Sequence, residues 1–209
     1  LKVVLSELRV FGAYDNLGEK NRKDFGETPV SAFKGLLRRL ENDPAYSPIH
    51  PKKAVPLLFG LLAHARKGLS GEELIGLFIQ ALEMEDNDSN RQKASDSVYL
   101  YLRQLRSYLA SREGRFDFFF ESFKIAALER FEGEHQFQRS KSDWHRLLAD
   151  YFIGQPLYRE VGEIKTPNLR KLSEQPYQQA YSGHKDDFLQ TLTNYFFIEA
   201  KASTLGIPS

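Results

Sequence analysis

The stretch AVPLLFGLLAHA, residues 54–65, contains no Lys, Arg, Asp or Glu and is apolar almost all round. A helix of this composition has to be buried against more than one neighbour. Gly68 then suits a helix C-terminus, and Ser70 with Glu73 forms a capping-box pattern that predicts the start of a second helix. We therefore expect residues 54–65 to form the centre of the fold, with the neighbouring segments packed around them.

Two further helices and a hairpin are predicted after this central segment. Apolar residues recur at helical spacing at Leu74, Leu77, Phe78, Ala81 and Leu82 and, beyond the polar loop EMEDNDSNRQK, at Val98, Tyr101, Leu102, Leu105 and Leu109. Glu113-Gly114 predicts a tight turn between YLASR and RFDFF, and the spacing of Phe116, Phe123, Ala127 and Phe131 predicts that the second strand continues directly into a fourth helix. Helix, helix, helix, hairpin is the order of a winged-helix domain. The predicted fold class is mainly α: a winged-helix domain with a small β-hairpin, flanked by helical segments.

The predicted domain division is 1–53, 54–131 and 132–209. In the first part, LKVVLSELRVFG reads as the tail of a helix begun upstream, and Thr28-Pro29 predicts the start of a helix that runs through Glu41. NDPAYSPIHPKK, with three prolines, predicts a connection without regular structure. The chain opens on Leu1 inside an apolar pattern and without an initiator Met, so we expect a piece of a larger protein.

The last part, 132–209, is expected to be a stack of short helices. Ser142 or Asp143 is the predicted cap of a helix with a regular apolar face at Trp144, Leu147, Leu148, Tyr151 and Phe152. Thr166-Pro167 predicts the start of the next helix and Gly183 its end. The apolar pattern continues at Phe188, Leu189, Leu192, Tyr195, Phe196 and Ile198.

Composition narrows the class of protein. The chain has 209 residues, 41% of them hydrophobic and 27% charged, which is typical of a globular protein with a sizeable core. Its 29 basic and 28 acidic residues give no electrostatic case for a general nucleic-acid or membrane surface. It contains no cysteine, no signal-peptide pattern and no apolar run long enough to span a membrane, so we expect a cytoplasmic protein without disulfides.

A search for catalytic and metal-binding motifs is negative. The sequence has no GxxxxGK[ST], GxGxxG, GxSxG or HExxH pattern, and its five histidines lack metal-ligand spacing. Asp86-x-Asp88-x-Asn90 resembles the start of an EF-hand loop, but Arg91 stands where the turn glycine is needed and Ser97 where the last glutamate is needed. We expect no catalytic residue, no metal site and no cofactor in this chain.

Nucleic-acid binding is the alternative function of a winged helix, whose third helix can enter a major groove. The candidate contacts are Arg103, Arg106, Arg112 and Arg115. Residues 54–131 carry ten basic and eleven acidic residues, a net charge of −1, whereas DNA-binding domains usually have a basic footprint. The charge balance favours solvated or intramolecular roles for these arginines.

Several strings resemble the middle of a NACHT-type STAND NTPase, a class of signalling ATPase that switches between a closed ADP form and an oligomeric ATP form. The strings are SELRVFG (6–12), TPVSAFKGLLRRLE (28–41), LLFGLLAHARKGLSGEELIGLF (57–78), LRQLRSYLASREGRFDFFFESFKIAALERF (102–131), WHRLLADYF (144–152) and NLRKLSEQPYQQAYSG (168–183). They are most similar to the branch that contains the telomerase-associated protein and bacterial NACHT proteins with C-terminal repeats.

The resemblance implies a regulatory role. Residues 1–53 would close the helical lid of an upstream nucleotide-binding domain, 54–131 would be the winged helix that packs on that domain, and 132–209 would lead to a C-terminal repeat sensor. ATP or ADP with Mg²⁺ would be bound by the parent protein, the active form would be a homo-oligomer, and no membrane partner is implied.

One position departs from the family pattern. The family commonly has a histidine at the start of the last winged-helix helix, in a pattern such as F-x-H-x-S-F, that reaches the ADP phosphate. Aligned on Ser122-Phe123, this chain has Phe120 there, and a register shifted by one residue would substitute Phe119. A phenylalanine cannot donate that hydrogen bond. We expect Phe120 to be buried, with packing in place of nucleotide sensing.

Overall fold

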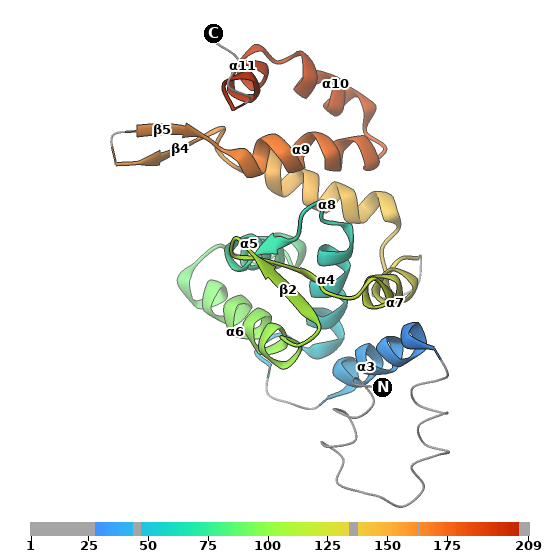
Figure 1. Cartoon of the computed structure of the whole chain (residues 1–209). Helices are drawn as coiled ribbons and strands as arrows, with labels where there is room; N and C mark the ends of the chain where they lie inside the picture. The colour runs from blue at the N-terminus through green and yellow to red at the C-terminus, as the bar shows by residue number, and fades with distance from the viewer. Residues whose placement is uncertain (1–27, 44–46, 134–137, 163, 205–209) are drawn as a thin grey trace, which may run out of the picture.

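The computed structural model describes residues 28–43, 47–133, 138–162 and 164–204. These residues are mainly helical, as the sequence predicts, with nine helices and two small antiparallel sheets. In chain order the elements are α3 (Pro29–Asn42), α4 (Pro51–His64), β1 (Leu69–Ser70), α5 (Gly71–Ala81), α6 (Asp88–Gln104), β2 (Leu109–Arg112), β3 (Arg115–Phe118), α7 (Glu121–Phe131), α8 (Lys141–Gly154), β4 (Tyr158–Val161), β5 (Ile164–Pro167), α9 (Leu169–Tyr181), α10 (Lys185–Thr193) and α11 (Tyr195–Ser203). Figure 1 shows α3 at one end, the elements from α4 to α7 in the middle, and α8 to α11 at the other end.

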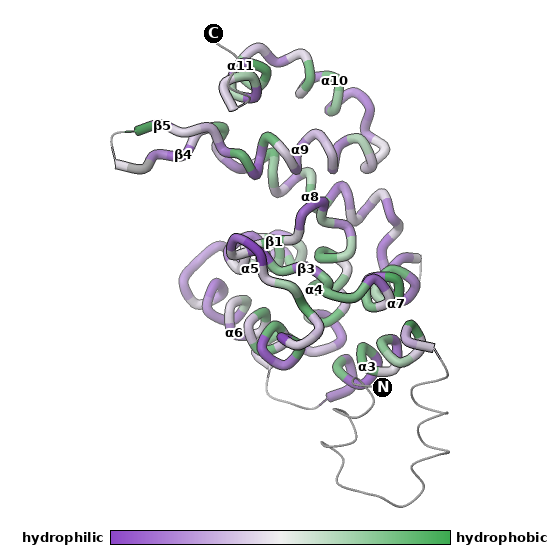
Figure 2. The backbone as a smooth tube through the Cα atoms, viewed as in Figure 1, coloured by the Kyte–Doolittle hydropathy of each residue, from purple (hydrophilic) through white to green (hydrophobic). Residues whose placement is uncertain are grey.

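Helix α4 is the centre of the fold, as expected. Every residue from Ala54 to His64 is buried, and hydrophobic residues follow this helix in Figure 2. The helix begins at Pro51 rather than at Ala54, because Pro51 fits the first turn and the His50 Nδ1 accepts a hydrogen bond from the Lys52 backbone N–H (3.2 Å). The connection predicted over residues 42–53 therefore ends at His50.

The first sheet has the strand order β1-β3-β2, with both pairings antiparallel. The turn predicted at Glu113-Gly114 is confirmed, because both residues have positive φ (52° and 73°), as a two-residue hairpin turn requires. Phe116 lies in β3 opposite Leu69. The prediction that the second strand continues directly into a fourth helix is confirmed, because β3 ends at Phe118 and α7 begins at Glu121.

Helix α5 starts with the predicted capping box of Ser70 and Glu73. Helix α6 begins at Asp88, within the stretch predicted to be a loop, because the Asn87 side chain accepts a hydrogen bond from the Asn90 N–H and caps the helix. Short polar residues that read as a loop thus serve as a helix start.

Helix α3 starts at Pro29 with Thr28 as its cap, as predicted, and packs against α7. The ring of Phe33 stacks on that of Phe123 with centroids 4.5 Å apart. The Arg130 Nε of α7 also donates to the Glu41 Oε1 of α3 at 2.8 Å.

Helix α8 packs closely on the central helices. A Cβ atom at Gly60 of α4 would overlap the indole of Trp144, and one at Gly76 of α5 would lie 2.6 Å from the Tyr151 ring. The Trp144 indole N–H donates to the Phe131 carbonyl oxygen (3.1 Å). The cap of α8 is Ser140 rather than Ser142 or Asp143, because the Ser140 side chain accepts from the Asp143 N–H.

One hydrophobic cluster extends from α3 through α8, and α9 and α11 share a smaller one of Leu172, Phe197 and Ala200. The larger cluster continues across both predicted boundaries, at 53/54 and 131/132. The structure does not test the domain division, which stays a prediction. The helix tail predicted within residues 1–27 lies outside the described residues.

A hairpin of β4 and β5 precedes α9 and projects from the molecule in Figure 1. It was not expected, and it corrects the prediction that Thr166-Pro167 starts a helix: both residues belong to β5, and α9 is capped by Asn168. The predicted end of this helix at Gly183 agrees with the last helical residue, Tyr181.

The apolar pattern of α10 and α11 only partly faces the core. Phe197 and Ala200 are buried, whereas Tyr195, Phe196 and Ile198 are exposed. Within the part of the chain that the structure describes, no helix is both long and apolar enough to cross a membrane.

Candidate functional site

Phe120 lies at the start of α7, where it is the N-cap residue and provides no side-chain hydrogen bond. Its side chain is 37% exposed, so the expected burial is wrong. The position in the core is taken by Phe123, which is fully buried against Phe33. Phe119, the alternative residue in the shifted register, is 65% exposed. Neither Phe119 nor Phe120 fills the interior, so the expectation that packing takes the place of nucleotide sensing here is not supported.

The four candidate arginines are distributed over different elements. Arg112 and Arg115 are paired across the β2–β3 hairpin, and Arg115 forms an ion pair with Glu113. Arg103 lies at the end of α6, where its Nε donates to the Tyr99 carbonyl oxygen at 3.3 Å, and Arg106 lies in the turn that follows. The strand register brings together the two hairpin arginines, with an acidic residue between them.

A buried polar cluster joins the central helices to α8 and α9. We call this cluster the polar junction, and its side chains are His64, Glu73, His145, Arg170, Glu174 and Gln178. Helix α4 provides His64, α5 provides Glu73, α8 provides His145 and α9 provides the other three. Residues more than ninety positions apart in the sequence thus meet in one network.

Arg170 is the cationic centre of the polar junction. Its Nε and Nη2 donate to the two carboxylate oxygens of Glu73 at 2.7 and 3.0 Å, and its Nη1 donates to Glu174 at 3.2 Å. Its Nη2 also donates to the Gly68 carbonyl oxygen at 2.8 Å. Burial alone would lower the pKa of Arg170, but the hydrogen bonds and charges of Glu73 and Glu174 raise it, so the guanidinium stays charged.

Glu174 and Gln178 extend the network toward α4 and α8. Glu174 is fully buried, and its Oε2 accepts hydrogen bonds from the Arg66 backbone N–H (3.3 Å) and the Gln178 amide (3.0 Å). The same amide donates to the His64 carbonyl oxygen at 3.2 Å, while its oxygen lies 2.6 Å from the His145 Nδ1. Glu174 and Gln178 thus each have a partner outside α9, and these bonds tie α9 to the end of α4 and to α8.

The two histidines of the polar junction are held neutral. Burial lowers the pKa of His64 to about 4, against a hydrogen bond to the Gly60 carbonyl oxygen that favours the charged form. Burial also lowers the pKa of His145, opposed by its hydrogen bond to Gln178. Their rings are in edge-to-face contact, with centroids 5.2 Å apart. Protonation of both histidines would place two positive charges side by side, and the charge of His145 accordingly contributes to the lowered pKa of His64.

This arrangement suits a structural joint. Charged partners satisfy one another, and among the described residues no group of three or more His, Cys, Asp or Glu side chains could hold a metal ion. Comparisons with protein-family models, with curated proteins and with solved structures find no match for this chain. The case for a function therefore rests on the arrangement of its own residues.

Sequence reasoning missed the polar junction. The only sign of it is a polar stripe on α9, where Lys171, Glu174, Gln175 and Gln178 follow helical spacing and are all buried. Such a stripe ordinarily faces water. Only the position of α9 against α8, with which it shares its most extensive helix contact, makes the stripe an interior face.

Proposed function

We propose that this chain is the regulatory segment of a signalling ATPase of the NACHT-type STAND class. In this proposal residues 54–131 form a winged helix that packs on an upstream nucleotide-binding domain of the same protein. The helices after residue 132 lead to a C-terminal sensor. A movement of the sensor side would be transmitted to the winged helix as a rigid-body rotation.

The observation that carries the proposal is the strand order β1-β3-β2 combined with the order helix, strand, helix, helix, hairpin. This topology is expected of a winged helix, with the Glu113-Gly114 turn as its wing. The polar junction supports a coupling role, because it links the central helices directly to α8 and α9. The exposed rings of Phe119 and Phe120 support a docking surface beside the start of α7.

The DNA-binding alternative has weaker support. Residues 54–131 have a net charge of −1, and Glu113 partly neutralises the hairpin arginines. Phosphate neutralisation supplies most of the affinity for DNA, so we expect a dissociation constant of roughly 10⁻⁴ M or weaker at physiological salt. Sequence-dependent gel shifts at submicromolar protein would favour this alternative.

The nucleotide-binding side of the proposal has a direct test. This chain has no P-loop, so calorimetry with Mg-ATP and Mg-ADP should detect no micromolar binding, and no hydrolysis should occur. The proposal also requires a P-loop domain in the region encoded upstream. Its absence there, or micromolar binding of Mg-ATP by this chain, would contradict the proposal.

The docking surface can be tested with that upstream domain expressed separately. We expect it to bind this chain and expect Phe119→Glu to weaken the binding. Ile164→Glu on the β4–β5 hairpin is the matched control, because Ile164 is 67% exposed and Phe119 is 65% exposed. Equal effects of the two substitutions would exclude the Phe119 surface.

A further inference from the structure

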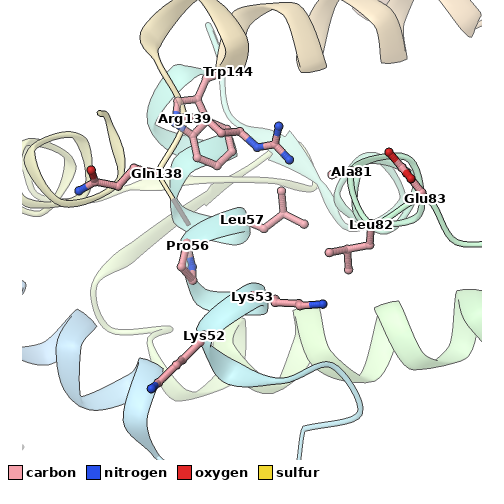
Figure 3. A pocket seen from close by; sticks show the side chains of 10 residues that line it. All are labelled: Lys52, Lys53, Pro56, Leu57, Ala81, Leu82, Glu83, Gln138, Arg139 and Trp144. Carbon is pink, nitrogen blue, oxygen red and sulfur yellow. The ribbon is translucent and has the colours of Figure 1, made fainter. Parts of the chain in front are cut away.

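A hollow of about 400 Å³ lies between the first turns of α4, the end of α5 and the segment that leads into α8. Figure 3 shows the ten side chains that line it. Pro56 and Leu57 of α4, Leu82 at the end of α5 and the indole of Trp144 supply its apolar wall. Hollows of this size are large enough for a small organic ligand.

Three cationic side chains surround this apolar wall: Lys52, Lys53 and Arg139. They come from two parts of the chain, the start of α4 and the segment before α8. None of the three forms an ion pair within the described ranges, whereas the partly buried Arg130 and Arg170 are paired with Glu41 and Glu73. Glu83 is the one carboxylate that lines the hollow, so the lining has a net charge of +2.

One of the three cations is held in place by the wall of the hollow. The Arg139 guanidinium lies over the Trp144 ring, 5.6 Å from its centroid, which fixes the arginine at the rim. Lys52 and Lys53 occupy the first turn of α4, which contains no acidic residue, so their charges add to the positive end of the helix dipole. An anion in the hollow would be attracted by these charges and by the helix dipole.

We propose that this hollow binds a small phosphate monoester. A monoester carries a charge of about −1.5 to −2 at neutral pH, which matches the net charge of the lining, and its terminal oxygens can accept hydrogen bonds from cations that line the hollow. The organic group of the ester would lie on Pro56, Leu57 and Leu82. The proposal is independent of the regulatory function, because no residue of the polar junction lines the hollow.

Trp144 makes the test specific, because it is the single tryptophan of the chain and lines the hollow. Phenyl phosphate is the probe, and its titration is followed by Trp144 fluorescence and by the single indole N–H resonance. We expect saturable changes in both signals. Inorganic phosphate, which lacks the apolar group, and benzyl alcohol, which lacks the charge, should each bind more weakly.

The variants Lys52→Gln and Lys53→Gln remove exposed cations and leave the apolar wall intact. Each should weaken phenyl phosphate binding by roughly tenfold, the typical contribution of one charge-assisted hydrogen bond. Lys185→Gln on α10 is the matched control, because Lys185 is also exposed but does not line the hollow. It should bind as the unmodified chain does.

Three results would overturn the proposal. The first is a Trp144 signal that does not respond to phenyl phosphate. The second is unchanged affinity in both lysine variants, or benzyl alcohol binding as tightly as the ester. The third is a phosphotyrosine heptapeptide that binds at least tenfold more tightly than phenyl phosphate, which would assign the hollow to a phosphorylated protein instead of a small ester.

Discussion

Phe120 and Phe123 stand three residues apart and have different surroundings. Phe123 is fully buried in a cluster with Phe33, Phe59 and Phe118, whereas Phe120 touches Phe33 from the surface. Phe123→Ala should therefore lower the free energy of unfolding by about 3–5 kcal/mol, and Phe120→Ala by less than about 1 kcal/mol. Urea unfolding of both variants measures the difference. A comparable loss for Phe120→Ala would mean that its ring belongs to the core.

Arg170 is the residue on which the polar junction depends. Arg170→Met would leave the carboxylates of Glu73 and Glu174 buried without their cation, which should cost about 3–5 kcal/mol of unfolding free energy. Arg146→Met is the matched control, because Arg146 is exposed and its pair with Asp150 at 3.9 Å should contribute less than about 1 kcal/mol. Chemical denaturation that gave the two variants equal stability would show that the Arg170 pairs are not stabilising the fold.

At the scale of elements, the contact between α4 and α8 depends on a missing side chain. Gly60→Ala would push a methyl group into the Trp144 indole, which is itself 1% exposed. Overpacking of this kind should destabilise the chain by about 1–3 kcal/mol. Gly154→Ala at the end of α8 is the control, because a Cβ there meets nothing within 4 Å. Thermal unfolding compares the two, and an unchanged midpoint for Gly60→Ala would contradict the tight contact.

Pro176 of α9 leaves a backbone carbonyl oxygen that Lys201 of α11 binds. Pro176 has no N–H, so the Leu172 carbonyl oxygen loses its usual helical donor. The Lys201 ammonium of α11 donates to that oxygen at 3.1 Å instead. The carbonyl oxygen that Pro176 leaves without a donor in α9 thereby forms a hydrogen bond with α11.

Elements fixed by local chemistry could be predicted from the sequence. The cap at Thr28, the capping box at Ser70 and the turn at Glu113-Gly114 depend on neighbouring residues only, and the structure contains all three. The β4–β5 hairpin was missed because its exposed strands lack an apolar alternation, and Thr166-Pro167 looks equally suited to a helix start. Local patterns do not distinguish these two outcomes.

The sites were less predictable than the elements. The polar junction and the cationic hollow each combine residues from elements that are far apart in the chain, and no spacing rule connects Glu73 with Arg170 or Lys53 with Arg139. The burial of Glu174 depends on where α9 lies against α8. Such sites are properties of tertiary packing and not of any one segment.

At the scale of the whole molecule, the buried histidines couple the folded state to pH. His64 is 4% exposed, and burial lowers its pKa from 6.5 to about 4; Lys124 and Lys141 also disfavour its charged form, while the Glu132 carboxylate lies 3.7 Å from its Nε2. The unfolded chain therefore binds more protons than the folded chain between these two pH values. The stabilisation is fully present above about pH 6.5 and is lost as the pH falls toward 4.

We expect the free energy of unfolding to decrease by roughly 3 kcal/mol between pH 6.5 and pH 4 through His64, with a further decrease from His145, whose pKa is also lowered. Urea unfolding at pH 7.5, 6, 5 and 4 measures this slope. His64→Gln cannot take up the proton and should flatten the slope, whereas His184→Gln, at the exposed start of α10, should keep it. If both variants retained the full slope, the proton uptake would have to occur at groups other than His64.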